Sequence, residues 1–160
     1  MPLKLVDIDD RLIHGQVATT WIPDFGIESV IIVNDACAND PVQRSVAGLA
    51  VPNIKVSVFT VEKFIDVLKK TTLKKVTLVL FGNPVDALAL KKNGLDFTYL
   101  NVSGMRFNDE RQRIHKNMSI TADEKRAFEE LESLGVECWM QTTTRDTKER
   151  VPDLLKNFKG

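Results

Sequence analysis

The sequence predicts an α/β protein: a three-layer α/β/α single domain, residues 1–160, with a central mostly parallel sheet of about six strands. The main observation is that short, β-rich apolar runs alternate with segments of helical period, which indicates βα units. A chain of 160 residues suits one domain of ordinary size. Its 43% hydrophobic and 28% charged residues exclude a disordered or low-complexity chain.

The first unit combines a strand at 3–8 with a helix at 15–21. Charged residues interrupt the apolar run at 9–14 and predict a loop there. Pro23 and Gly26 follow the helical segment, so we expect the helix to end before Pro23.

The second and third units follow the same pattern. A nearly continuous apolar run predicts a strand at 29–33 that is covered on both faces, and a helix follows at 41–49. A third strand is expected at 56–59. Thr60 can cap the next helix, whose apolar residues follow the i, i+3, i+4, i+7 spacing over 61–68.

A fourth buried strand is expected at 76–81, after which Pro84 suits the first position of a helix. Residues 97–102 supply the fifth strand. The polar and basic stretch 104–116 has no clear period, which predicts a long loop or an edge excursion.

A capping box, Thr121-Ala-Asp-Glu124, begins the next helix, and its apolar stripe stops at Gly135. The sixth strand is expected at 136–142, and a short helix at 151–158 closes the chain.

Composition excludes several classes of function. The 22 Lys and Arg balance the 22 Asp and Glu, which argues against a nucleic-acid partner. Cys37 and Cys138 stand far apart without metal-ligand spacing, which favours a reduced, cytoplasmic compartment and no metal. No apolar segment approaches the roughly twenty residues of a membrane span. Nucleotide-binding glycine motifs are missing, so no cofactor is expected.

The carboxyl ends of parallel strands form the ligand-facing edge of such a sheet. Among the loops at this edge, the loop at 9–16 carries the most charged and potentially reactive side chains. One ring nitrogen of His14 could attack an electrophile such as phosphorus while the other donates a hydrogen bond. Gly15 leaves room beside the imidazole. Arg11 could bind phosphate oxygens, and Asp10 could orient Arg11 or the imidazole. A plain solvated histidine is the competing interpretation.

The segment IDDRLIHGQV at 8–17 resembles the active-site signature of the IIB components of the mannose/fructose/sorbose family of the bacterial phosphoenolpyruvate-dependent sugar phosphotransferase system. The resemblance extends along nearly the whole chain, through VNDACANDPVQ, LFGNPVDAL, LNVSGM and SITADEKRAFEELESLGVEC.

The resemblance implies a phosphoryl carrier, a protein-N(π)-phosphohistidine–sugar phosphotransferase. His14 would take a phosphoryl group on Nδ1 from a phosphohistidine of the IIA component. It would pass the group to a sugar that enters through the membrane components IIC and IID. Arg11 matches the arginine of the motif. The protein would then be cytoplasmic and peripherally associated with the transporter, and a homo-oligomer is left open.

One departure from the family concerns a basic residue. Many members carry an arginine two residues before the IDDR string, whereas this chain has Val6 and Asp7 ahead of Ile8. Arg106, or the basic stretch 111–116 that includes Arg111, His115 and Lys116, could supply the missing charge.

Other residues are weaker candidates for binding phosphate or a partner. Gln16 lies in the motif, Asn83 and Ser103 end strands on the same edge, and Phe107 is expected to be exposed to a partner.

Two further classes of function remain as alternatives: a regulatory module that binds phosphate without being phosphorylated, and a small hydrolase that uses Asp10 and His14. Within the family, the segments MQTTTRDTKERV and SGMRFNDERQRIHKNMSIT are most similar to the N-acetylgalactosamine branch.

Overall fold

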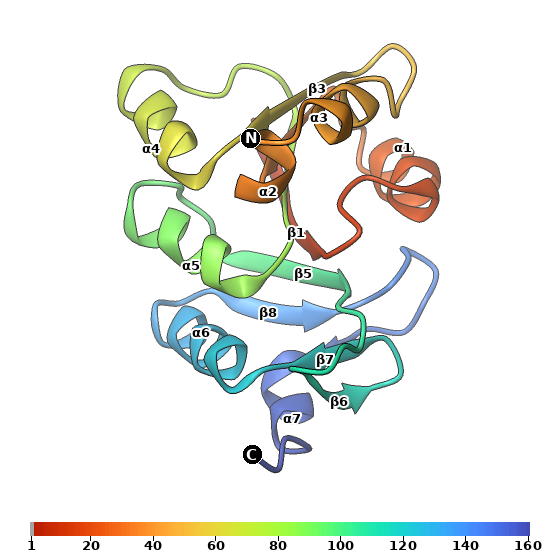
Figure 1. Ribbon diagram of the computed structural model, residues 1–160, viewed down its shortest axis with the longest axis vertical. Helices are drawn as coiled ribbons and strands as arrows, with labels where there is room; N and C mark the ends of the chain where they lie inside the picture. Colours follow the sequence, from red (N-terminus) through yellow and green to blue (C-terminus); the bar gives the residue numbers. More distant parts are fainter. Residues whose placement is uncertain (1) are drawn as a thin grey trace.

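A seven-stranded sheet forms the middle layer of the computed structural model, which describes residues 2–160 (Figure 1). The strand order is β3-β2-β4-β1-β5-β8-β9, and all neighbours are parallel except β8 and β9. The strands are β1 (Leu3–Asp9), β2 (Ser29–Val33), β3 (Lys55–Phe59), β4 (Thr77–Phe81), β5 (Tyr99–Gly104), β8 (Glu137–Met140) and β9 (Glu149–Arg150). The predicted three-layer fold is confirmed, and β9 is an addition to the six expected strands.

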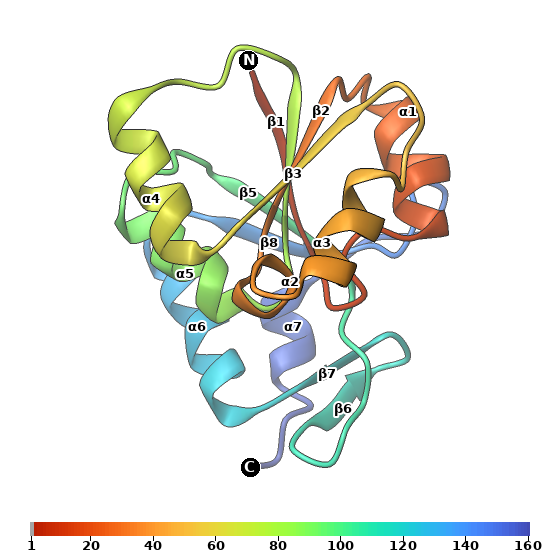
Figure 2. The same ribbon diagram turned by 45° about the horizontal axis from the view of Figure 1, so that its top comes forward.

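Helices cover both faces of the sheet, as Figure 2 shows. One face carries the π-helix η1 (Val17–Trp21), α1 (Ile22–Asp24), α2 (Asp35–Ala38) and α3 (Pro41–Gly48). The other face carries α4 (Val61–Lys70), α5 (Pro84–Lys92), α6 (Ala122–Ser133) and α7 (Val151–Leu155). None of the helices within residues 2–160 is long and apolar enough to cross a bilayer.

The alternation of side chains along β1 divides the core into two clusters. Val6 and Ile8 are buried against the α4–α6 side, whereas Leu5 is buried on the η1 side. Because successive strand residues point to opposite faces, Asp7 and Asp9 share the face of Leu5. Two carboxyl groups are therefore carried into the layer between the sheet and η1.

The capping residues predicted from the sequence lie at the ends of helices in the structure. The side chain of Thr60 accepts from Lys63 N–H at the start of α4. The Thr121 capping box at α6 is complete, and Gly135 follows that helix with φ +85°.

The helix after β1 extends further than predicted. It continues past Pro23 to the end of α1, so the expectation that it ends before Pro23 is wrong. Pro23 is the second residue of α1 and has no N–H to donate to the preceding turn, which belongs to the π-helix η1.

The stretch predicted as a long loop or an edge excursion leads into an antiparallel hairpin, β6 (Gln112–His115) and β7 (Met118–Ile120). The hairpin is attached to the end of β5: Met105 N–H donates to Asn117 O at 3.0 Å, and Ser119 N–H donates to Met105 O at 2.8 Å. The basic stretch is thus held beside the carboxyl end of the sheet.

The chain leaves the neighbouring strands β1 and β5 in opposite directions. After β1 it runs through η1 and α1 toward β2, and after β5 it runs through α6 toward β8 on the other face. Such a switch point opens a crevice at the carboxyl ends of the two strands.

Candidate functional site

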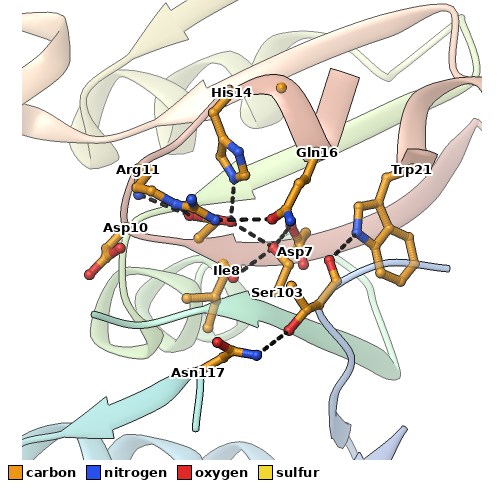
Figure 3. Close-up of polar contacts among 12 residues, drawn as sticks. Asp7, Ile8, Asp10, Arg11, His14, Gln16, Trp21, Ser103 and Asn117 are labelled. Carbon is orange, nitrogen blue, oxygen red and sulfur yellow. Dashed lines mark hydrogen bonds and ion pairs between the residues drawn. The ribbon is translucent and has the colours of Figure 1, made fainter. Parts of the chain in front are cut away.

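A tight turn after β1 returns His14 to the end of its own strand. Leu12 N–H donates to Asp9 O at 2.8 Å, and Leu12 adopts φ +58°, a conformation that is unusual for a leucine. His14 Nε2 then lies 2.6 Å from Asp9 Oδ2 (Figure 3).

Asp9 is completely buried and holds the centre of the site. Its Oδ1 accepts from Arg11 N–H at 2.9 Å and from Arg11 Nε at 3.4 Å. Burial by itself favours the neutral acid, but the hydrogen bonds and charges of His14 and Arg11 outweigh it and hold the pKa of Asp9 below its ordinary value. Asp9 is therefore ionised at neutral pH.

An ionised carboxylate at Nε2 fixes the tautomer of the ring. Nε2–H donates to Asp9, so the neutral imidazole has its free lone pair on Nδ1. Within residues 2–160, Nδ1 of His14 makes no hydrogen bond, and a Cβ at Gly15 would meet no atom within 4 Å. The lone pair of Nδ1 is therefore left without a hydrogen-bond partner among the described residues, and there is open space at Gly15 next to His14.

Asp10 contacts neither the imidazole of His14 nor the side chain of Arg11, so the expectation that it orients one of the two is wrong. Its carboxylate accepts from Arg106 N–H at 2.8 Å, Arg106 Nε at 3.1 Å and Arg111 Nη1 at 2.7 Å. Asp10 follows the last strand residue, so its side chain turns away from the face that carries Asp9. The small hydrolase built on Asp10 and His14 loses its catalytic pair.

Arg111 is occupied by carboxylates. Its Nη2 and Nε donate to Glu124 at 2.8 and 3.0 Å, and its side chain is only 8% exposed. These contacts raise the pKa of Arg111 despite burial. Arg111 therefore fastens the hairpin to α6 and Asp10, and it is not free to bind phosphate.

A cavity of about 720 Å³ opens between the loops that follow β1, β5 and β8. Its walls include Arg11, Arg106, Arg113 and Lys116, against the single carboxylate of Asp146. An excess of cations in a concave site attracts an anionic group or an acidic partner surface. The basic stretch 104–116 and the loop at 9–16 both reach this cavity, the latter through Arg11 and Gln16, whereas His14 is not among the lining residues.

The other predicted residues divide into two groups. Gln16 accepts from Arg11 Nη2 at 3.3 Å, Ser103 is buried against Asp9, and Phe107 is 58% exposed on the cavity wall. Asn83 does not line this cavity: its side chain accepts from Asp86 N–H and caps α5. The expectation that Asn83 lies in the pocket is wrong.

His115 differs from His14 in having both ring nitrogens engaged. Nδ1 accepts from Asn117 N–H at 3.1 Å, and Nε2 lies 2.7 Å from Glu149 Oε2. It lines the cavity wall without a free lone pair. Among residues 2–160, no group of three or more His, Cys, Asp or Glu could hold a metal ion.

Sequence reasoning missed Asp9 as the partner of His14. The alternation along β1 places Asp9 on the face of Leu5 and η1, but only because the strand extends to Asp9, one residue beyond the predicted end. The polar residues at the end of β8 were also missed. One of them, Thr142, links the end of β8 to η1, because its carbonyl accepts from Trp21 Nε1 at 3.1 Å (Figure 3).

A doubly wound sheet that carries a histidine on an ionised carboxylate, next to a cavity lined by arginines at its switch point, has the chemistry that phosphoryl transfer requires. The family profile described as "PTS system sorbose subfamily IIB component" matches residues 3–159. The chain belongs to this family, the IIB components of the mannose/fructose/sorbose group, which are phosphoryl carriers in sugar phosphotransferase systems.

Relatives named for several sugars are similar to the chain. It is 34% identical over 98% of its length to the fructose-specific EIIB component of Bacillus subtilis, which it also covers to 98%. It is 36% identical over 87% of its length to an N-acetylgalactosamine-specific IIB component of Escherichia coli, covering 89% of that protein. The mannose-specific EIIAB component of Escherichia coli is 32% identical over 99% of this chain, which spans 50% of that relative.

The fold is likewise similar to a solved structure of the family. The IIBSor domain of the sorbose permease of Klebsiella pneumoniae superposes with a TM-score of 0.92 at 33% identity, over 99% of each chain.

Proposed function

We propose that His14 carries the phosphoryl group. Nδ1 of His14 accepts it from a phosphohistidine of a IIA component and then donates it to a sugar held by the membrane components IIC and IID. The observation that carries this proposal is the 2.6 Å contact between Nε2 and the ionised Asp9, which leaves the lone pair on Nδ1.

The first transfer needs no added proton. The lone pair of Nδ1 forms a bond to phosphorus while the bond from phosphorus to the donor ring breaks, and the donor nitrogen recovers its lone pair. The attack leaves positive charge on the His14 ring, and Asp9 stabilises that charge through Nε2–H. Arg11 donates to Oδ1, the other oxygen of Asp9, and also lines the cavity. Its guanidinium can therefore bind the phosphoryl oxygens.

The partners follow from this role. The cavity rim with Arg106, Arg113 and Lys116 suits a transient, electrostatically guided encounter. The fused EIIAB relative supports IIA as the donor. We place the protein in the cytoplasm beside its transporter and treat residues 1–160 as one IIB domain.

The test is labelling with phosphoenolpyruvate, the general components and IIA. Wild type should gain one acid-labile phosphate, and His14→Ala should gain none. His115→Gln is the matched control, because both nitrogens of His115 are already engaged, and it should label fully. No label on wild type would contradict the carrier and favour the regulatory alternative.

Arg106→Ala should slow phosphoryl transfer from IIA by roughly tenfold, because it removes a cation from the cavity rim. Asp10 keeps its contact with Arg111 in this variant, so the loop should stay folded. Stopped-flow or quench measurements at rising salt check the effect, and the difference from wild type should shrink as charges are screened. Arg126→Ala on the exposed face of α6 is the control and should transfer at the wild-type rate.

The N-acetylgalactosamine branch stays a prediction for the transported sugar. Transport of candidate sugars by a deletion strain checks it, and growth lost on N-acetylgalactosamine alone is the expected result.

A further inference from the structure

Asp7 is a buried carboxyl that the proposed transfer does not use. It lies on β1, has no exposed surface, and forms no ion pair with a Lys, Arg or His of residues 2–160. An isolated buried carboxylate is unfavourable unless its charge is removed or compensated. A proton on the Asp7 carboxyl would remove this charge.

Asn101 fixes one oxygen of Asp7 as an acceptor. Asn101 Nδ2 donates to Asp7 Oδ1 at 2.9 Å and to Gln141 O at 3.0 Å, so both amide hydrogens are used. Any proton on the carboxyl consequently belongs on Oδ2, the oxygen that faces Ser103 (Figure 3).

Ser103 lies between two carboxyl groups. Its Oγ is 2.7 Å from Asp7 Oδ2 and 3.0 Å from Asp9 Oδ2. A hydroxyl has one hydrogen to donate, so both short contacts can be hydrogen bonds only if one carboxyl donates in return. Asp9 already accepts from His14 and Arg11 and is the ionised member.

We infer that Asp7 is a protonated acid and a positioning residue for His14. Its Oδ2–H donates to Ser103, the Ser103 hydroxyl donates to Asp9, and Asp9 is left to accept Nε2–H of His14. The chain of hydrogen bonds then runs in one direction and holds Nδ1 as the free nitrogen. This inference rests on the proposed phosphorylation of His14.

The surroundings of Asp7 support the neutral form. Burial raises the pKa of Asp7 to about 8, and the charge of Asp9 adds to the rise, whereas the hydrogen bonds that Ser103 and Asn101 donate to the ionised carboxylate oppose it. The neighbouring strand β4 presents Leu80 at this register, and η1 covers the face with apolar side chains.

The nearest cationic groups, those of His14 and Arg11, do not contact Asp7 and are linked to it only through Asp9. His14 and Arg11 both contact Asp9, and β5 contributes the uncharged Ser103 and Asn101. Ionisation of Asp7 would draw the Ser103 hydroxyl away from Asp9. It would also add a negative charge near a site that must accept an anionic phosphoryl group.

The experiment compares wild type with Asp7→Asn between pH 6 and pH 9.5. Asparagine keeps an oxygen for Asn101 and an N–H for Ser103, so transfer at neutral pH should match wild type. At pH 9 the wild-type rate should fall to about a tenth of the Asp7→Asn rate, as follows for a pKa near 8 when only the acid form transfers.

Two spectroscopic readouts use the unphosphorylated protein. Infrared difference spectra should show the C=O band of a buried carboxylic acid in wild type and lose it in Asp7→Asn. The ring nitrogens of His14 should show an inflection near pH 8 in NMR titration, and this inflection should vanish in Ser103→Ala while the infrared band persists.

Each outcome decides the inference. A missing acid band, or the same pH profile in wild type and Asp7→Asn, would overturn it. If wild type takes no phosphate while the band and the inflection are present, the proposed function fails and the protonated chain stands. Circular dichroism confirms that both variants are folded.

Discussion

Asp9→Asn is expected to lower the rate of phosphoryl transfer through His14 by about a thousandfold or more, the scale found when a catalytic histidine is held in the wrong tautomer. The two donors of Arg11 face Oδ1 of residue 9, so the amide oxygen of asparagine must take that position. Its NH₂ group then faces Nε2 of His14 and donates to it. The ring proton moves to Nδ1, and the nucleophilic lone pair is lost from that atom.

Rapid-quench kinetics measure the rate, and ring nitrogen shifts in NMR report the tautomer. Asp66→Asn, an exposed position on α4, is the matched control and should transfer like wild type. A wild-type rate in Asp9→Asn, or a ring still protonated on Nε2, would remove Asp9 from the mechanism.

Arg111→Leu is expected to lower the free energy of unfolding by about 3 to 5 kcal/mol, the range for removing one partner of a buried ion pair. Arg111 is the group that compensates Glu124, which is 7% exposed, and it also binds Asp10. Leucine would leave both carboxylates without that cation, and the desolvation of Glu124 would no longer be offset.

Urea unfolding followed by circular dichroism measures this loss. Arg126→Leu lies on the same helix as Glu124, and its exposed pair with Asp123 should contribute about 0.5 kcal/mol or less. A loss below about 1 kcal/mol in Arg111→Leu would show that the network of Asp10, Arg111 and Glu124 is solvated in solution.

Features of the fold that depend on neighbouring residues could be predicted from the sequence. The capping box at Thr121 and the glycine stop at Gly135 each act within a few residues, and both are confirmed. The hairpin from Gln112 to Ile120 could not be predicted in the same way. Its position depends on Met105, a residue that meets it only in the folded chain.

The same distinction, between neighbours in the sequence and neighbours in the folded chain, applies to the site residues. A motif of adjacent residues identified His14, Arg11 and the loop that carries them, and the structure places them together at the switch point. The choice between Asp9 and Asp10 required knowing where β1 ends, because one residue in a strand changes the face on which a side chain lies. Ser103 reaches Asp9 only through the pairing of β1 with β5.

The π-helix η1 fixes the number of residues that can separate His14 from Trp21. Ile22 N–H donates to Val17 O, five residues back, and Trp21 is tied to the end of β8 through Thr142. Deleting one residue here would favour ordinary α pairing and turn the start of the helix by about 100° relative to Trp21. Gln16 would swing away from Arg11, so this stretch should tolerate substitutions far better than insertions or deletions.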